Sequence, residues 1–337
     1  MASGENGKDL VLWPATRWQD DHRIEREALG PELAAAFYAG FDAVPEADWR
    51  RCRAIVCSQD IPAPYRDRLD RLGILVAPRV GVDPFDLDDW TRRGVPVCNV
   101  PDYGTLEVAD HAMAFMLALL RGIEFHTTAL RTDLHDHWRP TLNPLGRRLS
   151  TLTLGIVGLG RIGSAVALRA RAFGMRVQFF DPWLPRGAGL ALGAERVDSM
   201  AALFAAADVV SLHTPLTAET RYMVDARMLA ACRPGLLLIN TARGELLDLD
   251  ALYQALREDR VGGAGLDVLP EEPPDAGHPL LADFQAQAPW LQGRLLLTPH
   301  AAYVTPESTR DKRAKGAQVA ARWLLDGVLE NCVNGLS

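Results

Sequence analysis

Cysteine is scarce in this chain. The sequence contains five cysteines, an odd number, and no CxxC pair. Small disulfide-stapled domains and structural zinc modules need cysteines at paired, short spacings, so neither class fits. Cys98 and Cys232 adjoin apolar runs, where we expect buried, reduced thiols rather than nucleophiles.

Long apolar runs and excess positive charge are also missing. The most notable apolar run, Met113 to Leu120, is far shorter than the roughly 20 residues of a membrane helix. The first residues include acidic ones and no apolar stretch before a small-residue cleavage site, unlike a signal peptide. A net charge of -7 and a pI near 5.6 give no basic field for nucleic-acid phosphates. We therefore expect a cytoplasmic, soluble protein that binds neither membranes nor nucleic acid directly.

The composition is that of an ordinary globular protein, and the length indicates two domains. Of 337 residues, 48% are hydrophobic and 23% charged, which is enough for two cores. Strand-like segments alternate with helix-like ones in two series, typical of parallel sheets built from βαβ units. We predict an α/β protein with two doubly wound parallel-sheet domains. The predicted domains are a substrate domain of residues 1–104 completed by 304–337, and a cofactor domain of residues 105–303.

Helices are expected in several stretches, including Glu307 to Leu325, which could return to pack on the first domain. Pro31 to Tyr38 and Pro64 to Leu72 lie between strand-like segments of the first series, and a long helix is predicted from Leu106 to about Leu130. Ala112 to Leu120 is apolar nearly all round, so this helix must be covered on several faces. We therefore expect a homodimer in which a second subunit covers it.

A glycine motif follows a buried strand. Leu154 to Val157 leads into the GxGxxG of residues 158–163 and then into a helical stretch. Gly158 permits the tight turn, Gly160 lets the backbone approach a pyrophosphate, and Gly163 lets helix and strand pack closely. In this context the motif predicts a dinucleotide site; the alternative is a structural turn.

Asp181 ends the next strand, 18 positions after Gly163. An acid at about this spacing accepts hydrogen bonds from the adenosine ribose and disfavours a 2′-phosphate. The cofactor is therefore predicted to be NAD rather than NADP, although Arg186 lies a few residues on.

Three polar residues follow strands of the second series, where sites of open α/β sheets lie. Arg243 follows Leu236 to Asn240, Glu272 follows Gly263 to Val268, and His300 follows Leu295 to Thr298. Arginine suits bidentate binding of a carboxylate, histidine suits proton transfer near neutral pH, and a carboxylate beside it would favour the imidazolium. Taken singly, each residue also has a structural interpretation: Arg243 as part of a surface ion pair, Glu272 as a solvated loop residue and His300 as a hydrogen-bonded core histidine.

Several motifs resemble the D-isomer-specific 2-hydroxyacid dehydrogenases, in particular the C-terminal-binding-protein branch. They run from about Val80 to Asn334 and include VCNVP at 97–101, DPWL at 181–184, NTARG at 240–244, GLDV at 265–268, TPHAA at 298–302 and NCVN at 331–334. The resemblance implies that an NAD-dependent enzyme interconverts a small 2-keto acid and a D-2-hydroxy acid. It assigns Arg243 to the substrate carboxylate and makes His300 the acid/base paired with Glu272.

The resemblance also extends the cofactor site, placing Asp267 toward the nicotinamide carboxamide and the 214–220 loop along the cofactor. The residues expected to bind NAD are Gly158, Gly160, Arg161, Ile162, Gly163, Asp181, Thr214, Pro215, Thr220, Thr241, Ala242 and Asp267. No metal is expected. His126, His135, His137, Asp133 and Asp136 lack the spacing of a known ligand set.

The sequence departs from the family pattern in three places. Arg79-Val80-Gly81 stands where the family has GxG beside the substrate carboxylate, and Tyr303 stands where the corepressor branch has Trp. We expect the side chains or backbone of these four residues, 79–81 and Tyr303, to line the substrate site. Arg79 either points into the cleft, favouring dicarboxylic substrates, or pairs with Asp83 or Asp86. The third departure is an insertion within 274–292, implied by the separation of 28 positions between Glu272 and His300.

Two other functions compete with the dehydrogenase. An NAD(H)-binding corepressor-like scaffold for protein partners is the main alternative, because that branch keeps the same three residues. A methyltransferase with a Gly-rich loop is disfavoured by the third glycine and the catalytic set.

Overall fold

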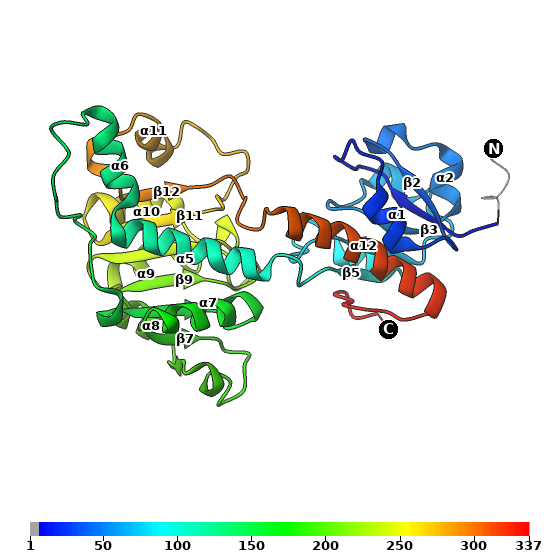
Figure 1. Ribbon diagram of the computed structural model, residues 1–337. Helices are drawn as coiled ribbons and strands as arrows, with labels where there is room; N and C mark the ends of the chain where they lie inside the picture. Colours follow the sequence, from blue (N-terminus) through cyan, green and yellow to red (C-terminus); the bar gives the residue numbers. More distant parts are fainter. Residues whose placement is uncertain (1–6, 337) are drawn as a thin grey trace. The chain divides into compact units, whose positions relative to one another are not determined.

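The computed structural model describes residues 7–336, which form two compact units. The small unit contains the chain up to Gly104 and again from Val304, and the large unit contains Thr105–Tyr303 (Figure 1). Each unit is an α/β domain with its own parallel sheet. This confirms the predicted fold class.

The sheet of the small unit has the strand order β2-β1-β3-β4-β5, and all of its strands are parallel. This is the doubly wound order of flavodoxin-like domains. Its strands are β1 (Leu10–Trp13), β2 (Ala34–Phe37), β3 (Cys52–Val56), β4 (Ile74–Ala77) and β5 (Val97–Asn99). Its helices are α1 (Arg23–Leu29), α2 (Glu46–Arg51), α3 (Ala63–Arg66), α4 (Leu87–Arg92) and α12 (Pro306–Asp326).

The last helix belongs to the small unit. α12 begins with Pro306 after the N-cap Thr305, whose side chain accepts a hydrogen bond from the Ser308 amide. Its small buried residues, including Ala317 and Ala320, belong to the apolar cluster of β1, β3 and β4. Helix α12 therefore covers one face of the sheet that residues 7–104 form.

Two predicted helices of the small unit are wrong. Residues 34–37 form β2, paired in parallel with β1. The alanines here favour a helix by propensity, but pairing with the buried β1 overrides that weak preference. Helix α3 spans only Ala63–Arg66, so most of the predicted Pro64 to Leu72 helix is absent.

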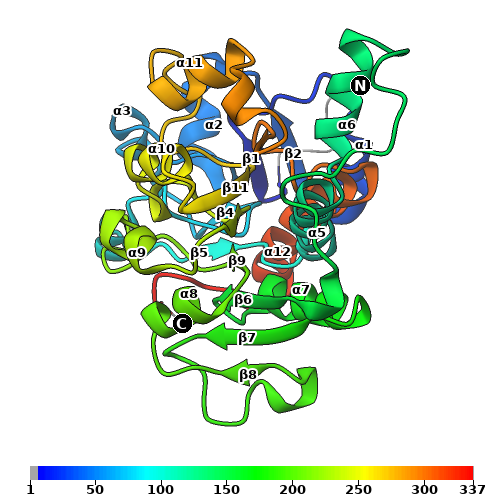
Figure 2. The ribbon, with the colours of Figure 1, turned by 90° about the vertical axis from the view of Figure 1, so that its left-hand side faces the viewer.

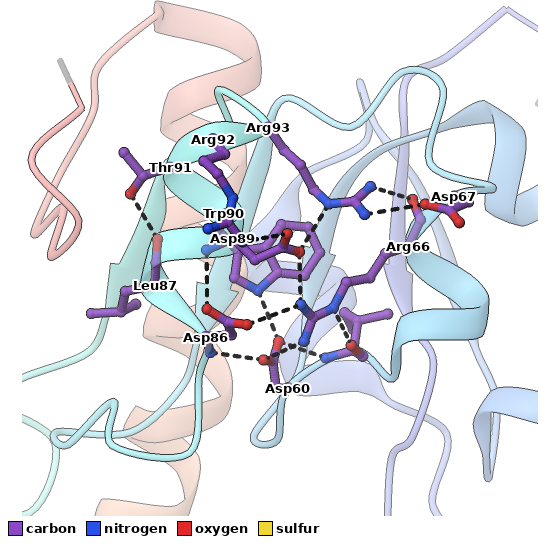
Figure 3. Close-up of polar contacts among 11 residues, drawn as sticks. Asp60, Arg66, Asp67, Asp86, Leu87, Asp89, Trp90, Thr91, Arg92 and Arg93 are labelled. Carbon is purple, nitrogen blue, oxygen red and sulfur yellow. Dashed lines mark hydrogen bonds and ion pairs between the residues drawn. The ribbon is translucent and has the colours of Figure 1, made fainter.

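A network of hydrogen bonds and ion pairs connects the α3 and α4 segments of the small unit (Figure 3). The carboxylate of Asp60 accepts hydrogen bonds from Arg66 at 2.7 Å, from the Asp86 amide at 2.8 Å and from the Trp90 indole at 2.8 Å. Arg66 also binds Asp89 at 2.7 Å. Because Trp90 is 1% exposed, its indole N–H needs this acceptor.

The sheet of the large unit has the order β12-β11-β10-β9-β6-β7-β8. The strands predicted before Gly158, Asp181, Arg243, Glu272 and His300 are all present, and the two-residue β8 is an additional edge strand (Figure 2). The strands are β6 (Thr153–Val157), β7 (Arg176–Phe180), β8 (Glu195–Arg196), β9 (Val209–Leu212), β10 (Leu236–Asn240), β11 (Val261–Leu266) and β12 (Leu295–Leu297). The helices are α5 (Thr105–Arg121), α6 (Ile123–Thr132), α7 (Arg161–Ala172), α8 (Met200–Ala206), α9 (Ala226–Ala231), α10 (Leu249–Arg257) and α11 (Pro279–Gln285). The order reverses between β6 and β9, as in a Rossmann fold.

The predicted long helix is two helices, α5 and α6, separated by Gly122. Gly122 has a φ of 63°, and a side chain there would meet Asn143 at 2.8 Å. The Asn143 amide also caps the end of α5 by donating to the Leu119 carbonyl at 2.8 Å. The apolar face of α5 packs against the sheet and α7 of its own unit. The premise that α5 needs a second subunit was therefore wrong.

The segment between Glu272 and His300, in which an insertion is expected, leaves the ends of β11 and β12 paired. β11 and β12 pair in register from Ala264 with Leu295 to Leu266 with Leu297. The segment contains α11 and a 3₁₀ turn at Pro289–Leu291. Within residues 7–336, no helix is long and apolar enough to cross a membrane, and no group of three His, Cys, Asp or Glu side chains is arranged to hold a metal ion.

Candidate active site

The glycine motif lies at the switch point of the large sheet. Gly158 has a φ of 89°, and a Cβ there would lie 2.8 Å from the His213 carbonyl after β9. A Cβ on Gly163 would lie 2.1 Å from the Gly158 carbonyl. A Cβ on Gly160 would meet no heavy atom within 4 Å among residues 7–336. Gly158 and Gly163 therefore build the turn, and Gly160 leaves open space at the N-terminus of α7, where a pyrophosphate fits.

Unsatisfied polar atoms line the same edge of the sheet. The hydroxyls of Thr214 and Thr241 are buried and lack a hydrogen-bond partner within the described chain, as does Nδ1 of His213. Buried polar atoms are normally paired, so these atoms are suited to hydrogen bonds with a ligand. Complete burial lowers the pKa of His213 to about 3, and the neutral ring contacts the Ser211 hydroxyl at 2.8 Å through Nε2. The residues present therefore fit a bound dinucleotide.

Asp181 lies directly after β7 and faces the glycine turn. One carboxylate oxygen accepts from the Leu159 amide at 3.0 Å, and the other accepts from the Trp183 amide at 3.0 Å. Each oxygen retains a lone pair for another donor. Arg161 and Ile162 form the first two positions of α7, beside this acid.

The remaining predicted cofactor residues belong to loops after β9 and β10. Thr220 closes the 214–220 loop by donating to the Pro215 carbonyl at 2.8 Å. Ala242 donates its amide to Asn240, at 3.0 Å. Thr220 thus has a structural task that the sequence did not reveal.

His300 and Glu272 form a direct pair in the large unit. Nδ1 of His300 lies 2.7 Å from Oε2 of Glu272, and the other oxygen of Glu272 accepts from the Leu269 amide at 3.1 Å. Burial raises the pKa of Glu272, but His300, the Leu269 amide and the charge of Arg243 together outweigh burial, and the net shift lowers that pKa. The carboxylate is therefore ionised at neutral pH, and Nε2 of His300 is left for a proton transfer.

Asp267 holds the turn that carries His300. Its buried carboxylate accepts from the Thr298 hydroxyl at 2.5 Å and from the amides of Ala301 and Ala302 at 2.8 and 3.0 Å. The Thr298 hydroxyl in turn contacts His111 at 3.0 Å. His300 itself has a φ of 53°, which costs energy for a residue other than glycine. The network of Asp267 maintains this conformation, a role that the sequence did not reveal.

Arg243 follows β10 in a turn fixed by buried Asn240. The Asn240 side chain donates to the Arg243 carbonyl at 2.8 Å. A Cβ on Gly244 would lie 1.9 Å from the Leu269 carbonyl carbon, so only glycine lets this turn close against the segment that leads to Glu272. The fold therefore brings all three predicted catalytic residues to one edge of the sheet.

A pocket of about 520 Å³ adjoins the pair. Glu272 and His300 line it together with Leu281 and Phe284 of α11. Tyr303 packs edge-on to His300, with ring centroids 6.3 Å apart. Helix α11 thus forms part of the wall of the pocket beside the pair.

The other predicted substrate residues lie in the small unit, in the loop after β4. Arg79 donates through Nη1 to the Ser58 carbonyl at 3.1 Å, and the Val80 carbonyl accepts from the Asn99 side chain at 2.7 Å. Gly81 continues the same loop. Asp86, a proposed partner of Arg79, lies 3.7 Å from Arg66.

Sequence comparison identifies the family. Residues 113–302, more than half of the chain, match the family model described as "D-isomer specific 2-hydroxyacid dehydrogenase, NAD binding domain". The chain belongs to the D-isomer-specific 2-hydroxyacid dehydrogenases. Its large unit is accordingly the NAD-binding domain of that family.

Named members of this dehydrogenase family resemble the chain over most of its length. D-3-phosphoglycerate dehydrogenase of Methanocaldococcus jannaschii is 35% identical over 80% of this chain and 48% of that protein. Glyoxylate reductase of Pyrococcus furiosus is 33% identical over 95% of this chain and 88% of the relative. The chain thus spans about half the length of the first of these relatives.

A solved dehydrogenase structure has the same architecture. D-lactate dehydrogenase of Aquifex aeolicus, complexed with NAD and lactic acid, superposes with a TM-score of 0.82 at 30% identity, covering 97% of this chain and 100% of that one. The three names are those of enzymes. They support the dehydrogenase interpretation and do not support the corepressor alternative or the branch suggested by the sequence motifs.

Proposed function

We propose that the protein is an NAD-dependent oxidoreductase that interconverts a 2-keto acid and a D-2-hydroxy acid. The observation that carries the proposal is the His300–Glu272 pair at 2.7 Å, next to Arg243 at the carboxyl edge of an NAD-binding domain. Residues 1–104 and 304–337 form the proposed substrate domain.

The protein's own side chains have separate tasks in this reaction. The glycine turn of residues 158–163 and Asp181 would hold NADH, which would supply the hydride for C2 of the keto acid. Nε2 of His300 donates the proton to the developing alkoxide, and Glu272 orients the imidazole through Nδ1. Arg243 binds the substrate carboxylate by paired charge-assisted hydrogen bonds.

The direct test is NADH oxidation with a panel of 2-keto acids, followed by chiral analysis of the products. We expect turnover of at least one keto acid to the D-hydroxy acid. Turnover to the L-isomer, or none across the panel with NADH bound, would refute the proposed activity.

We expect NADH to bind more tightly than NADPH because Asp181 would repel a 2′-phosphate. Asp181→Asn keeps an acceptor for the Leu159 amide and removes the negative charge. In this variant the dissociation constants of NADH and NADPH should therefore differ less than in the wild type. Fluorescence titration measures both constants, and Asp198→Asn is a control on the same unit. Equal or tighter binding of NADPH by the wild type would overturn the assignment.

The pH profile tests the role of Glu272. Reduction requires a protonated imidazole, and the ionised Glu272 favours that form. Glu272→Gln should therefore move the alkaline limb of kcat for reduction to lower pH. The control is Glu271→Gln, an exposed neighbour. A limb that stays in place in Glu272→Gln argues against the pairing.

The protein is proposed to be a homodimer, with the interface on α6 and the loop that follows it. Four large apolar side chains of this segment are exposed: Ile123, Leu134, Trp138 and Leu142. Exposed apolar surface supports an interaction site. Light scattering should give the mass of two chains, and Trp138→Asp with Leu142→Asp should lower it. A wild type that stays monomeric at every concentration contradicts the dimer.

A cytoplasmic location is also proposed. All five cysteines are free, and four of them are buried. Free thiols are typical of a reducing compartment.

A further inference from the structure

Two sequence motifs contain cysteines that the proposed function does not use. VCNVP at 97–101 places Cys98 in the middle of β5, and NCVN at 331–334 places Cys332 in the segment after α12. Both residues belong to the small unit. These two residues, called the cysteine pair below, lie directly opposite each other in an antiparallel β-bridge.

Backbone hydrogen bonds lie on both sides of the cysteine pair. The amide of Asn99 donates to the Asn331 carbonyl at 3.1 Å. The amide of Val333 donates to the Val97 carbonyl at 2.8 Å. In antiparallel strands this pattern marks a non-hydrogen-bonded pair, whose Cα atoms lie about 4.5 Å apart. A disulfide spans Cα separations of about 4.4–6.8 Å, so the backbone already has the spacing that a bridge needs.

The two thiols also lie on the same face of the sheet. Cys98 is 0% exposed and belongs to the apolar cluster that contains Ala317 and Ala320 of α12, and Cys332 packs against that cluster. Val97 belongs to the apolar cluster on the opposite face, as expected for a strand whose side chains alternate between faces. The register therefore directs both sulfur atoms toward the α12 side of β5.

The Cys98 thiol is buried and interacts with its neighbour. Burial, and after it the Cys332 thiol, raise the pKa of Cys98 to about 12. Cys332 is half-buried and donates to Oδ1 of Asn334 at 3.2 Å. The Asn334 side chain also accepts from the Val97 amide and donates to the Val95 carbonyl, each at 3.0 Å. Asn334 thus holds the segment after α12 beside β5, and Cys332 is the more exposed member of the pair.

The other two cysteines of the small unit are too far away to compete. Cys52 and Cys57 lie at opposite ends of β3, and five residues of strand span about 16 Å. Strand β4 separates β3 from β5, so Cys57 lies at least about 10 Å from Cys98. Both separations exceed the roughly 7 Å between Cα atoms that a disulfide can bridge.

We infer that Cys98 and Cys332 are a redox pair, which a hydroperoxide converts into a disulfide that joins β5 to the segment after α12. The Cys332 sulfur, as its thiolate, attacks one peroxide oxygen, the O–O bond breaks, and the leaving oxygen takes a proton and departs as water. The Cys98 sulfur then attacks the Cys332 sulfenic acid, the S–O bond breaks, and the hydroxyl departs as water with the Cys98 proton. The two thiols lose two electrons in total, and the peroxide gains them.

The disulfide joins the two chain segments that make up the small unit. It closes a loop that contains the whole large unit and α12. In the chain-entropy model, a longer closed loop gives a larger gain in stability. In a reducing compartment the cysteine pair stays as thiols, and a dithiol reductant reverses the bridge by thiol–disulfide exchange. The bridge is therefore a reversible response to an oxidant that stabilises the small unit.

The test uses the full chain, reduced with dithiothreitol, desalted and treated with hydrogen peroxide. Remaining thiols are blocked with N-ethylmaleimide, and the peptides are mapped by mass spectrometry. We expect one pair of peptides linked through Cys98 and Cys332. Thiol titration of the denatured chain should count five thiols before oxidation and three after it, because the bridge consumes two. Dithiothreitol should restore all five.

Thermal unfolding measures the stabilisation. Oxidation should raise the melting temperature of the wild type by roughly 5–15 °C, and dithiothreitol should reverse the shift. Cys332→Ser, at the half-buried position, should abolish both the linked peptides and the shift. Cys232→Ala, which removes a buried thiol of the large unit, is the matched control and should retain both.

The inference fails if five thiols persist after peroxide treatment, if the disulfide joins two chains on a non-reducing gel, or if Cys332 is oxidised to the sulfinic acid without a bridge. An unchanged melting temperature in the bridged chain would overturn the stabilising role. None of these measurements uses catalytic turnover, so their outcome is independent of the proposed dehydrogenase activity.

Discussion

Replacing His300 with asparagine should lower kcat by about 10²-fold or more, the usual contribution of a general acid. Asparagine keeps an amide near the position of Nδ1 but cannot supply a proton at the position of Nε2. The His300–Glu272 pair lies after β12 and β11, whereas the glycine turn lies after β6. The dissociation constant of NADH should therefore change little.

Stopped-flow measurement of kcat and fluorescence titration of NADH test this prediction together. His126→Asn, on α6, is the matched control and should retain wild-type kcat. A kcat in His300→Asn within threefold of the wild type would exclude His300 as the proton donor.

The second large effect is expected at Arg243. Its guanidinium can bind a carboxylate with two parallel hydrogen bonds, whereas an ammonium acts as a point charge. We expect Arg243→Lys to lower kcat/KM by about 10-fold and Arg243→Gln by about 10²-fold or more, because charge-assisted hydrogen bonds contribute roughly 1.5–3 kcal/mol each.

Steady-state kinetics across keto-acid concentrations measure both variants. Arg257→Lys is the control, because Arg257 packs over the Trp290 ring at 4.8 Å, a contact that lysine can retain. An equal loss of kcat/KM in Arg243→Lys and Arg243→Gln would show that bidentate geometry is not used. Loss of NADH binding in either variant would assign Arg243 to the cofactor instead.

The sequence predicted the elements whose pattern is local. The buried strands of the large unit, the glycine turn and Asp181 all follow from short segments read in order, because a parallel strand buried on both faces is a nearly continuous apolar run. The placement of Arg243, Glu272 and His300 at one edge of the sheet followed from one rule: functional sites of open α/β sheets lie beyond the carboxyl ends of the strands.

Other features depended on contacts between distant residues. The alanines of β2 resemble a helix until their pairing with β1 is known. The break at Gly122 depends on Asn143, which lies in a later loop. The need for glycine at position 244 arises from Leu269 on the next βα loop. No local pattern in the sequence reports such packing.

The burial of Lys312 was missed for the same reason. Lys312 is one of several charged residues on a helix that is polar on average, and the sequence contains no sign that its side chain is buried. Its burial depends on the return of α12 to the first sheet.

That return also sets the order in which a newly made chain can fold. The large unit is continuous in sequence, so all its strands are translated before α12. The small unit begins first but finishes last: α12 packs on β3 and β4, and the amide of Val333 donates to the Val97 carbonyl at 2.8 Å. Domains fold as units during synthesis, so one face of the first sheet stays uncovered until α12 has been translated. During that interval we expect chaperones to bind the uncovered apolar face.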